Sequence, residues 1–346
     1  MTNPKFTLSK TTLLEQYNKL KDLGLKVSYS YKTNQEVGNL LQNITPDCEF
    51  SIHREEEIKK ISDKGKIWFF TQAESEQELK QLIEKQIKNF VIDNETDLKR
   101  ILNIIEQNST KINLSLRMKF QEHRIGTGKY FVYGMSSQKV NEIIQKIQNN
   151  ENIEKLGIHI HRKSQNTSEW EIKKELEDSL TPETLKRINF LNLGGGLPTK
   201  YRSYTSKVLP YIFQKITEAK TWLSQFNIKT YIEPGRFLAA PCIKLETEII
   251  QIYDKNIIIN TTIYNCALDS VLTQTKMLVK QELEESEQGN YFLIKGNSPT
   301  RDDIFRYKVK LNNPKVGDKI TFLNAGAYNY TTDFFGYKKL ETEIQD

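Results

Sequence analysis

Between about residues 10 and 235 the chain repeats one pattern, a short apolar run followed by a longer stretch with helical spacing. Stretches such as residues 76–85, 96–106 and 138–148 place apolar residues three and four positions apart, which is typical of amphipathic helices. Such strand–helix units predict an α/β fold, a (β/α)8 TIM-type barrel, although a doubly wound open sheet gives a similar alternation. The eight apolar runs are residues 27–31, 48–52, 67–70, 90–93, 112–118, 156–161, 188–193 and 230–233.

Beyond residue 240 the pattern changes to short runs rich in β-branched and aromatic residues. Turn-forming Asp, Asn, Gly and Pro residues separate these runs, which predicts an antiparallel β domain. A chain of 346 residues is long enough for two domains that share one site. The runs in question are residues 245–253, 256–263, 291–295, 305–311 and 319–323.

The composition excludes several classes of protein. The net charge is +6, but the lysines are scattered among glutamates, and the sequence has no basic cluster with interleaved aromatics, so nucleic-acid binding is not expected. The three cysteines, Cys48, Cys242 and Cys266, lack metal-ligand spacing and predict neither a disulfide framework nor a zinc site. No apolar run suits a signal peptide or a membrane span, so we expect a soluble cytoplasmic protein.

Candidate functional residues follow the strand-like runs, where barrel enzymes carry their catalytic groups. Lys32 ends an apolar, aromatic run that can lower the pKa of its amine, as a Schiff-base lysine requires. His161 ends another run and can stack on a flat cofactor, while Ser164 can donate to a phosphate. Taken singly, a lysine at a strand end is usually solvated, and a histidine there is equally often part of the core.

Two further segments extend the pattern. Gly194, Gly195 and Gly196 allow backbone N–H groups to approach phosphate oxygens, although three glycines also suit a tight turn. Glu233 can face a pyridine nitrogen and keep it protonated, which makes the ring an electron sink, although it also suits a charge beside a Pro-Gly turn. Arg236 can pair with a phosphate. Together these segments predict pyridoxal 5'-phosphate as the cofactor.

At this point a family resemblance can be stated. Tyr29-Ser-Tyr-Lys-Thr-Asn34, His161-Arg-Lys-Ser-Gln165, the three glycines, Glu233-Pro-Gly-Arg236 and Ala325-Gly-Ala-Tyr328 resemble the ordered motifs of the fold-type III pyridoxal-phosphate decarboxylases. This is the ornithine, diaminopimelate and arginine decarboxylase group of amino-acid and polyamine metabolism, and the resemblance spans nearly the whole chain.

The resemblance implies an alanine-racemase-like, cofactor-binding barrel over residues 10–238 and a β domain over residues 239–346, which residues 1–9 join. It also implies a head-to-tail homodimer with shared active sites. In that arrangement Lys32 forms the Schiff base, His161 stacks on the ring and Glu233 pairs with the pyridine nitrogen. The residues implied around the phosphate are Ser164, Gly194, Gly195, Gly196, Gly235, Arg236 and Tyr328.

The chain departs from the family in the segment that reaches the substrate of the partner subunit. The family pattern there is Gly-x-x-Cys-(Asp/Glu)-x-x-Asp, whereas Pro299 replaces the cysteine and Thr300 the acid, and Asp303 matches. Ser298 and Arg301 lie in the same segment. Cys266 stands where a second substrate-facing aspartate is expected, and is a candidate proton donor.

The changes in charge bear on the substrate. Loss of acids disfavours ornithine and lysine, because a buried ammonium would lack a partner. Either Arg301 or Arg162, which replaces a valine of the family pattern, can receive a carboxylate. A substrate with an extra acid group is therefore predicted.

We predict a decarboxylase of an amino acid or an amino-acid-derived substrate, with no metal site. A racemase or epimerase is an alternative, but that chemistry goes with an arginine at the pyridine nitrogen instead of Glu233. A non-catalytic relative is the second alternative. A single-barrel cofactor carrier is expected to lack the β domain, and a regulatory pseudoenzyme is expected to lose Lys32 or the phosphate cradle.

Overall fold

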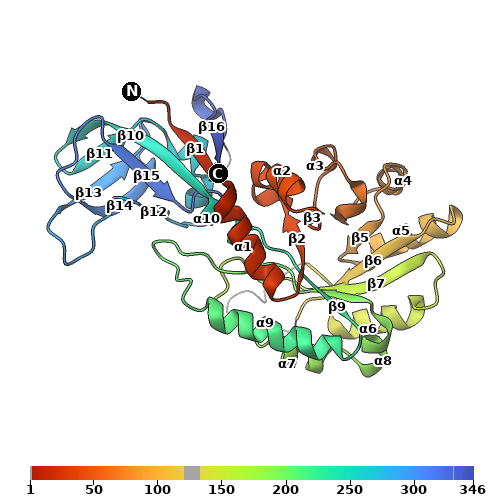
Figure 1. Cartoon of the computed structure of the whole chain (residues 1–346). Helices are drawn as coiled ribbons and strands as arrows, with labels where there is room; N and C mark the ends of the chain where they lie inside the picture. The colour runs from red at the N-terminus through yellow and green to blue at the C-terminus, as the bar shows by residue number, and fades with distance from the viewer. Residues whose placement is uncertain (1, 121–132, 330) are drawn as a thin grey trace.

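The computed structural model describes residues 2–120, 133–329 and 331–346, which form a closed barrel and a separate β sheet (Figure 1). Eight parallel strands close the barrel in chain order, so the predicted fold class is confirmed. The strands are β2 (Lys26–Ser30), β3 (Glu49–Ile52), β4 (Ile67–Phe70), β5 (Asn89–Ile92), β6 (Ile112–Arg117), β7 (Ile153–His159), β8 (Phe190–Asn192) and β9 (Lys229–Ile232).

Amphipathic helices connect the strands and surround the barrel. In α5 (Glu95–Gln107) the Asn94 side chain caps the first turn by accepting from the Asp97 N–H, and the buried Leu98, Ile101 and Ile105 recur three and four residues apart. α4 (Glu76–Glu84) begins with a capping box between Ser75 and Glu78. The other helices of this part are α1 (Lys10–Asp22), α2 (Gln35–Ile44), α3 (Glu55–Ile58), α6 (Ser137–Ile147), α7 (Ile172–Ser179), α8 (Pro182–Arg187), α9 (Leu209–Ser224) and α10 (Arg236–Cys242).

Alternation along the strands divides the barrel interior into layers. Trp68, Phe70, Phe190 and Val91 form an apolar cluster separate from the main core, with Tyr231 packed against it. Buried polar side chains are also present on the barrel strands. The Ser28 and Ser51 Oγ atoms hydrogen-bond at 2.8 Å, and Ser51, His159 and Asn192 each hydrogen-bond to Glu233. These polar contacts provide a base on which a site can be built.

The second sheet is built by the C-terminal part of the chain together with the first strand. β1 (Lys5–Ser9) pairs antiparallel with β10 (Ile243–Tyr253) and parallel with β16 (Glu341–Gln345). β11 (Asn256–Ile259) also pairs in parallel with β13 (Asn290–Lys295), so the sheet is mostly but not wholly antiparallel. The remaining strands are β12 (Leu278–Val279), β14 (Ile304–Leu311) and β15 (Lys319–Leu323).

One expected strand is shorter than its apolar run. The run at residues 256–263 leaves the sheet after Ile259 and continues into two short helices, α11 (Ile263–Cys266) and α12 (Leu268–Leu272). The Thr262 hydroxyl caps α11 by accepting from the Tyr264 N–H, which explains why the strand stops before it. Within the described ranges, no helix is long and apolar enough to cross a membrane.

The β domain meets the barrel at the end of β2. Asn34 donates its Nδ2 to the Gly326 carbonyl at 2.8 Å, and the Tyr328 N–H donates to the Thr33 carbonyl at 3.0 Å. The turn that contains Lys32 is therefore held against the loop that contains Tyr328. This contact brings both domains to one cavity.

Candidate active site

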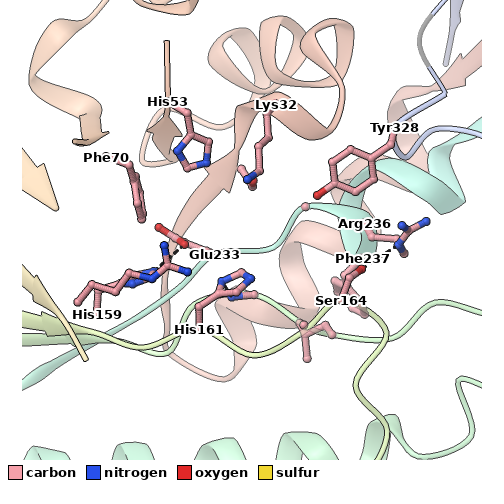
Figure 2. A pocket seen from close by; sticks show the side chains of 16 residues that line it. Lys32, His53, Phe70, His159, His161, Ser164, Glu233, Arg236, Phe237 and Tyr328 are labelled. Carbon is pink, nitrogen blue, oxygen red and sulfur yellow. Dashed lines mark hydrogen bonds and ion pairs between the residues drawn. The ribbon is translucent and has the colours of Figure 1, made fainter. Parts of the chain in front are cut away.

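A cavity lies at the carboxyl ends of the barrel strands, beside the β domain (Figure 2). It brings together nine of the residues predicted from sequence, which come from four different strand ends and from the β domain. The lining residues are Ser30, Lys32, His53, Phe70, Arg117, His159, His161, Ser164, Gly195, Gly196, Leu197, Glu233, Gly235, Arg236, Phe237 and Tyr328.

Lys32 follows β2 in a 3-10 turn, Tyr31–Thr33, and its side chain is exposed to the cavity. Nζ has no hydrogen-bond or ion-pair partner among the residues that the structure describes. Burial within the cavity lowers the pKa of Lys32; the Arg117 charge lowers it further, while Glu233 opposes the shift. The amine is thus unpaired and easier to deprotonate than a surface lysine, which suits a nucleophile.

Glu233 follows β9 and is buried at the opposite wall of the cavity (Figure 2). Oε1 accepts from Ser51 Oγ at 2.6 Å and Asn192 Nδ2 at 3.2 Å, and Oε2 accepts from His159 Nε2 at 2.9 Å. Burial alone would raise the pKa of Glu233, but His159 and the Ser51 hydrogen bond outweigh it and lower the pKa to about 2. The carboxylate is therefore ionised across the physiological range.

His161 lies on the floor of the cavity, two residues after β7 ends. Its Nδ1 accepts from the Gly195 N–H at 3.4 Å. Burial, followed by the nearby Arg117 charge, lowers the pKa of His161 to about 3, so the imidazole is neutral. A neutral flat ring at this position can lie against another ring without a charge to desolvate.

Backbone N–H groups from two glycine segments line the far end of the cavity. Gly194 has φ +68° and Gly196 has φ +105°, and a Cβ at Gly194 would meet the Ile160 carbonyl oxygen at 2.1 Å. Only glycine allows this close turn. Neither Gly196 nor Gly235 donates its backbone N–H to any residue that the structure describes. These N–H groups can donate hydrogen bonds to an anion such as a phosphate.

Arg236 lies behind the same end of the cavity and is almost fully buried. Its guanidinium donates to both oxygens of Asp269, at 2.6 and 3.0 Å, and to the Tyr201 hydroxyl at 2.9 Å. Nε donates to Ser164 Oγ at 3.2 Å, and the guanidinium carbon lies 5.2 Å from the Tyr328 ring centroid. Arg236 therefore holds Ser164 and Tyr328 in place, while Asp269 neutralises part of its charge.

The polarity of the cavity fits pyridoxal 5'-phosphate. A phosphate matches the N–H groups, the Ser164 hydroxyl and Arg236 at one end, and a pyridine nitrogen matches the ionised Glu233 at the other (Figure 2). Lys32 lies between the two ends, where the aldehyde carbon of such a molecule can reach its amine. A group with a single charged end would leave one of the two ends of the cavity unmatched.

The cavity also holds a candidate metal cluster. One ligand atom each from His159, His161 and Glu233 lies within 4.8 Å of the others. The Glu233 oxygens already accept three hydrogen bonds, however, and His161 Nδ1 accepts one. A metal ion would have to displace several of these bonds and would leave Lys32 and the glycine loop without a role.

Comparisons with known proteins agree with the geometry. The family model described as "pyridoxal-dependent decarboxylase, pyridoxal binding domain" matches residues 11–240. The chain belongs to this family. Pyridoxal phosphate is therefore its cofactor, as predicted, and the predicted fold-type III relationship is confirmed.

Individual relatives are similar over nearly their whole length. Diaminopimelate decarboxylase of Vibrio cholerae is 24% identical over 356 aligned residues, which cover 95% of this chain and 83% of the relative. Diaminopimelate decarboxylase from Helicobacter pylori, solved with L-lysine, has a TM-score of 0.83 at 19% identity and covers 100% of this chain and 92% of that one. Lysine decarboxylase from Selenomonas ruminantium has a TM-score of 0.81 at 17% identity, and the match covers 99% of this chain and 93% of that one.

Sequence reasoning missed several residues that the decarboxylase fold brings to the cavity. His53, Phe70, Arg117 and His159 all face inward from strand ends, and Asp269 approaches Arg236 from α12. The period-two alternation of a strand could have indicated His159, because it lies two residues before His161 and so faces the same side. No local sequence signal indicated Asp269.

Cys266 and Arg162 are among the predicted residues that lie outside the cavity, and both are engaged elsewhere. Cys266 is fully buried, and its thiol contacts the Thr262 carbonyl oxygen at 3.1 Å. Burial raises the pKa of Cys266 to about 12, so this thiol is a poor proton donor. Arg162 is also buried, and its guanidinium donates to Glu175 Oε2 at 2.8 Å and to the Glu169 carbonyl at 2.7 Å. It is a structural residue and is not available for a substrate carboxylate.

The segment at residues 296–303 lies in the β domain and does not line this chain's cavity. Asp303 is buried and accepts from the backbone N–H groups of Ile263 at 2.8 Å and Ser298 at 3.0 Å, which fixes the loop. Thr300 Oγ1 donates to the Tyr264 hydroxyl at 3.1 Å. The Arg301 side chain, in contrast, is 93% exposed, and its ion pair within the described part of the chain is with the exposed Asp302, at 3.5 Å.

Proposed function

We propose that the protein is a pyridoxal-phosphate-dependent decarboxylase that holds the cofactor through a Schiff base on Lys32 and acts on an amino acid with a second acid group. The observation that carries the proposal is the unpaired Lys32 amine between an ionised carboxylate and a loop of free N–H groups. The bound cofactor supplies an electron sink that stabilises negative charge on the substrate carbon after carbon dioxide leaves.

Each residue of the chain then has a distinct task. Lys32 would hold the cofactor covalently through its unpaired amine. Glu233 holds the ring-nitrogen proton, and the neutral His161 supports one ring face and excludes water there. Ser164 and the Gly196 N–H orient the phosphate end, so that the ring is fixed at both poles.

The alternative activities fit the same residues less well. A racemase would require a weaker electron sink, whereas the low pKa of Glu233 keeps a full negative charge at the nitrogen position. A pseudoenzyme has no need for an unpaired lysine beside a complete phosphate cradle. A metal-dependent activity through His159, His161 and Glu233 would leave that cradle unused.

The substrate part of the proposal depends on a second copy of the chain. In a head-to-tail dimer the segment at residues 296–303 reaches the partner's cavity, and Arg301 is the exposed cation that it carries. Arg117 adds a second cation inside the cavity, where its described contact is with the Tyr133 ring at 5.1 Å. Both favour a carboxylate over an ammonium on the distal part of the substrate. The diaminopimelate decarboxylase of V. cholerae, by its name, acts on such a substrate.

A substrate screen tests the proposal. The purified protein is loaded with pyridoxal phosphate and assayed for carbon dioxide release from matched pairs, such as diaminopimelate with lysine and glutamate with ornithine. We expect acidic substrates to have the higher kcat/KM, and Arg301→Gln to lower kcat/KM for them about tenfold or more while leaving cofactor binding unchanged. The matched control is Lys308→Gln, which removes another positive charge from the β domain.

Two results would contradict the proposal. A higher kcat/KM for ornithine or lysine than for every acidic candidate would refute the charge argument alone. Release of no carbon dioxide from any amino acid by a protein that binds the cofactor would refute the decarboxylase activity and favour a regulatory role.

A further inference from the structure

The two oxygens of Glu233 are used unequally. Oε1 accepts from both Ser51 and Asn192, whereas Oε2 accepts only from His159 Nε2, at 2.9 Å, among the residues in the described ranges. An ionised carboxylate offers about four acceptor positions, two on each oxygen. Oε2 is therefore the oxygen with room for one more donor, such as the N–H of a cofactor ring nitrogen. His159 is the residue that would share this oxygen with the ring.

The His159 ring is held in place by its surroundings. It is 1% exposed, and its strand, β7, pairs with β6 on one side and β8 on the other. The edge of Phe70 contacts it at 5.1 Å between ring centroids, and His161 stacks beside it at 6.2 Å with an interplanar angle of 18°. The imidazole therefore cannot turn away from Glu233 without disturbing the barrel interior.

The proton state of His159 follows from its two nitrogens. Carboxylate Oε2 only accepts, so Nε2 carries a proton, and Nδ1 is buried with no partner in the described part of the chain. A second proton on the ring would bury an unpaired N–H. Burial lowers the pKa of His159 and outweighs the opposing effect of Glu233, while Arg117 lowers it further.

The other titratable groups near His159 are His161, two residues beyond the end of its strand, and His53 and Lys32 across the cavity. Burial lowers the pKa of His53 and of His161 to about 3, so neither places a charge beside His159 near neutral pH. The Arg117 guanidinium carries a positive charge, which disfavours a second proton on the imidazole. His159 is thus kept as a neutral donor.

We infer that His159 is a positioning residue, whose Nε2–H keeps the Glu233 carboxylate ionised and turned so that Oε2 meets the nitrogen of the cofactor ring. The inference rests on the proposed function, because it assigns Glu233 to the ring nitrogen. Without the His159 donor, the burial that already opposes ionisation would raise the pKa of Glu233. Protonated Glu233 cannot hold a pyridinium proton.

The inference predicts a change in the pH dependence of cofactor binding. A carboxyl group with a lowered pKa supports cofactor binding while the pH is above that pKa. The affinity is lost as the pH falls through that pKa, because the carboxylate is protonated. Removing a hydrogen bond to a charged group should move this acid-side loss of affinity upward by about 1 to 2 pH units. A substitution that merely loosened the fold would lower the affinity at all pH values alike.

The test compares His159→Leu with His159→Gln, which keeps an N–H donor. Apoprotein is titrated with pyridoxal phosphate from pH 2.5 to pH 8, and binding is followed by the quenching of tryptophan fluorescence. We expect the acid-side loss of affinity to shift upward in His159→Leu and to return close to wild type in His159→Gln. Asn113→Ala is the control, because Asn113 bonds to Asn89 inside the same barrel and does not contact Glu233.

Three results would overturn the inference: a wild-type pH profile in His159→Leu, an equal shift in His159→Gln, or an equal shift in Asn113→Ala. Failure of the proposed function gives a different result, because the wild-type protein would then bind no pyridoxal phosphate at any pH. The two ideas can therefore be separated by one set of titrations.

Discussion

Removal of the Asp269 carboxylate should destabilise the apoprotein strongly. The Arg236 and Asp269 side chains are 4% and 2% exposed, and they form two hydrogen bonds of 2.6 and 3.0 Å. In Asp269→Ala the buried guanidinium would keep the Tyr201 and Ser164 hydroxyls as its hydrogen-bond partners among the described residues. Breaking one side of such a buried pair costs about 3–5 kcal/mol, because an uncompensated charge remains. Asp269→Asn keeps one acceptor and should cost less.

The cofactor should partly reverse this loss, because its phosphate offers Arg236 a new anion. Urea unfolding of apoprotein and of cofactor-loaded protein, measured for wild type, Asp269→Ala and Asp269→Asn, gives the required midpoints. We expect pyridoxal phosphate to raise the midpoint of Asp269→Ala by more than it raises that of wild type. An Asp269→Ala apoprotein within about 1 kcal/mol of wild type would refute the claim that this pair stabilises the cradle.

Three further outcomes are expected. Glu233→Gln should retain the cofactor but reduce turnover by about 10²-fold, which corresponds to about 2.7 kcal/mol, because an amide cannot hold the pyridinium proton. Unchanged steady-state turnover would show that the partner of the ring nitrogen is another residue. Cys266→Ala should keep kcat within about twofold, since the thiol is buried outside the cavity, whereas a tenfold loss would restore it as a proton donor. Lys32→Ala and Asp303→Ala chains, if each is inactive, should regain activity on mixing, because one site of the hybrid dimer has both residues; subunit exchange without activity would exclude shared sites.

The barrel and the cofactor end of the site were predictable because they depend on local patterns. Apolar runs at regular intervals gave the strands, and a strand has its functional end after its last apolar residue, which identified Lys32, His161 and Glu233. The glycine loop could also be predicted from the sequence, because a positive φ and a close approach of the backbone allow few residue types other than glycine.

The residues that sequence reasoning missed depend on long-range packing. Asp269 is 33 residues from Arg236 and lies in a short helix, α12, that was not predicted from the sequence. Arg162 was one of two arginines predicted as able to receive a substrate carboxylate, but Glu175 and the Trp170 ring hold it in a buried position away from the cavity. Cys266 was predicted from its alignment with an aspartate, which gives no information on burial. These choices follow from which face of a loop packs against the core, and no short motif encodes that.

The central claim, a covalent cofactor on Lys32, is tested most directly by reductive trapping. Cofactor-loaded wild-type protein is treated with borohydride, digested, and analysed by mass spectrometry alongside Lys32→Ala. We expect the wild-type protein to carry a phosphopyridoxyl group on Lys32. Lys32→Ala should carry no such group and should lack the visible absorbance band of the bound cofactor. A trapped group on another lysine of the wild-type protein, or a reducible visible band retained in Lys32→Ala, would contradict the account.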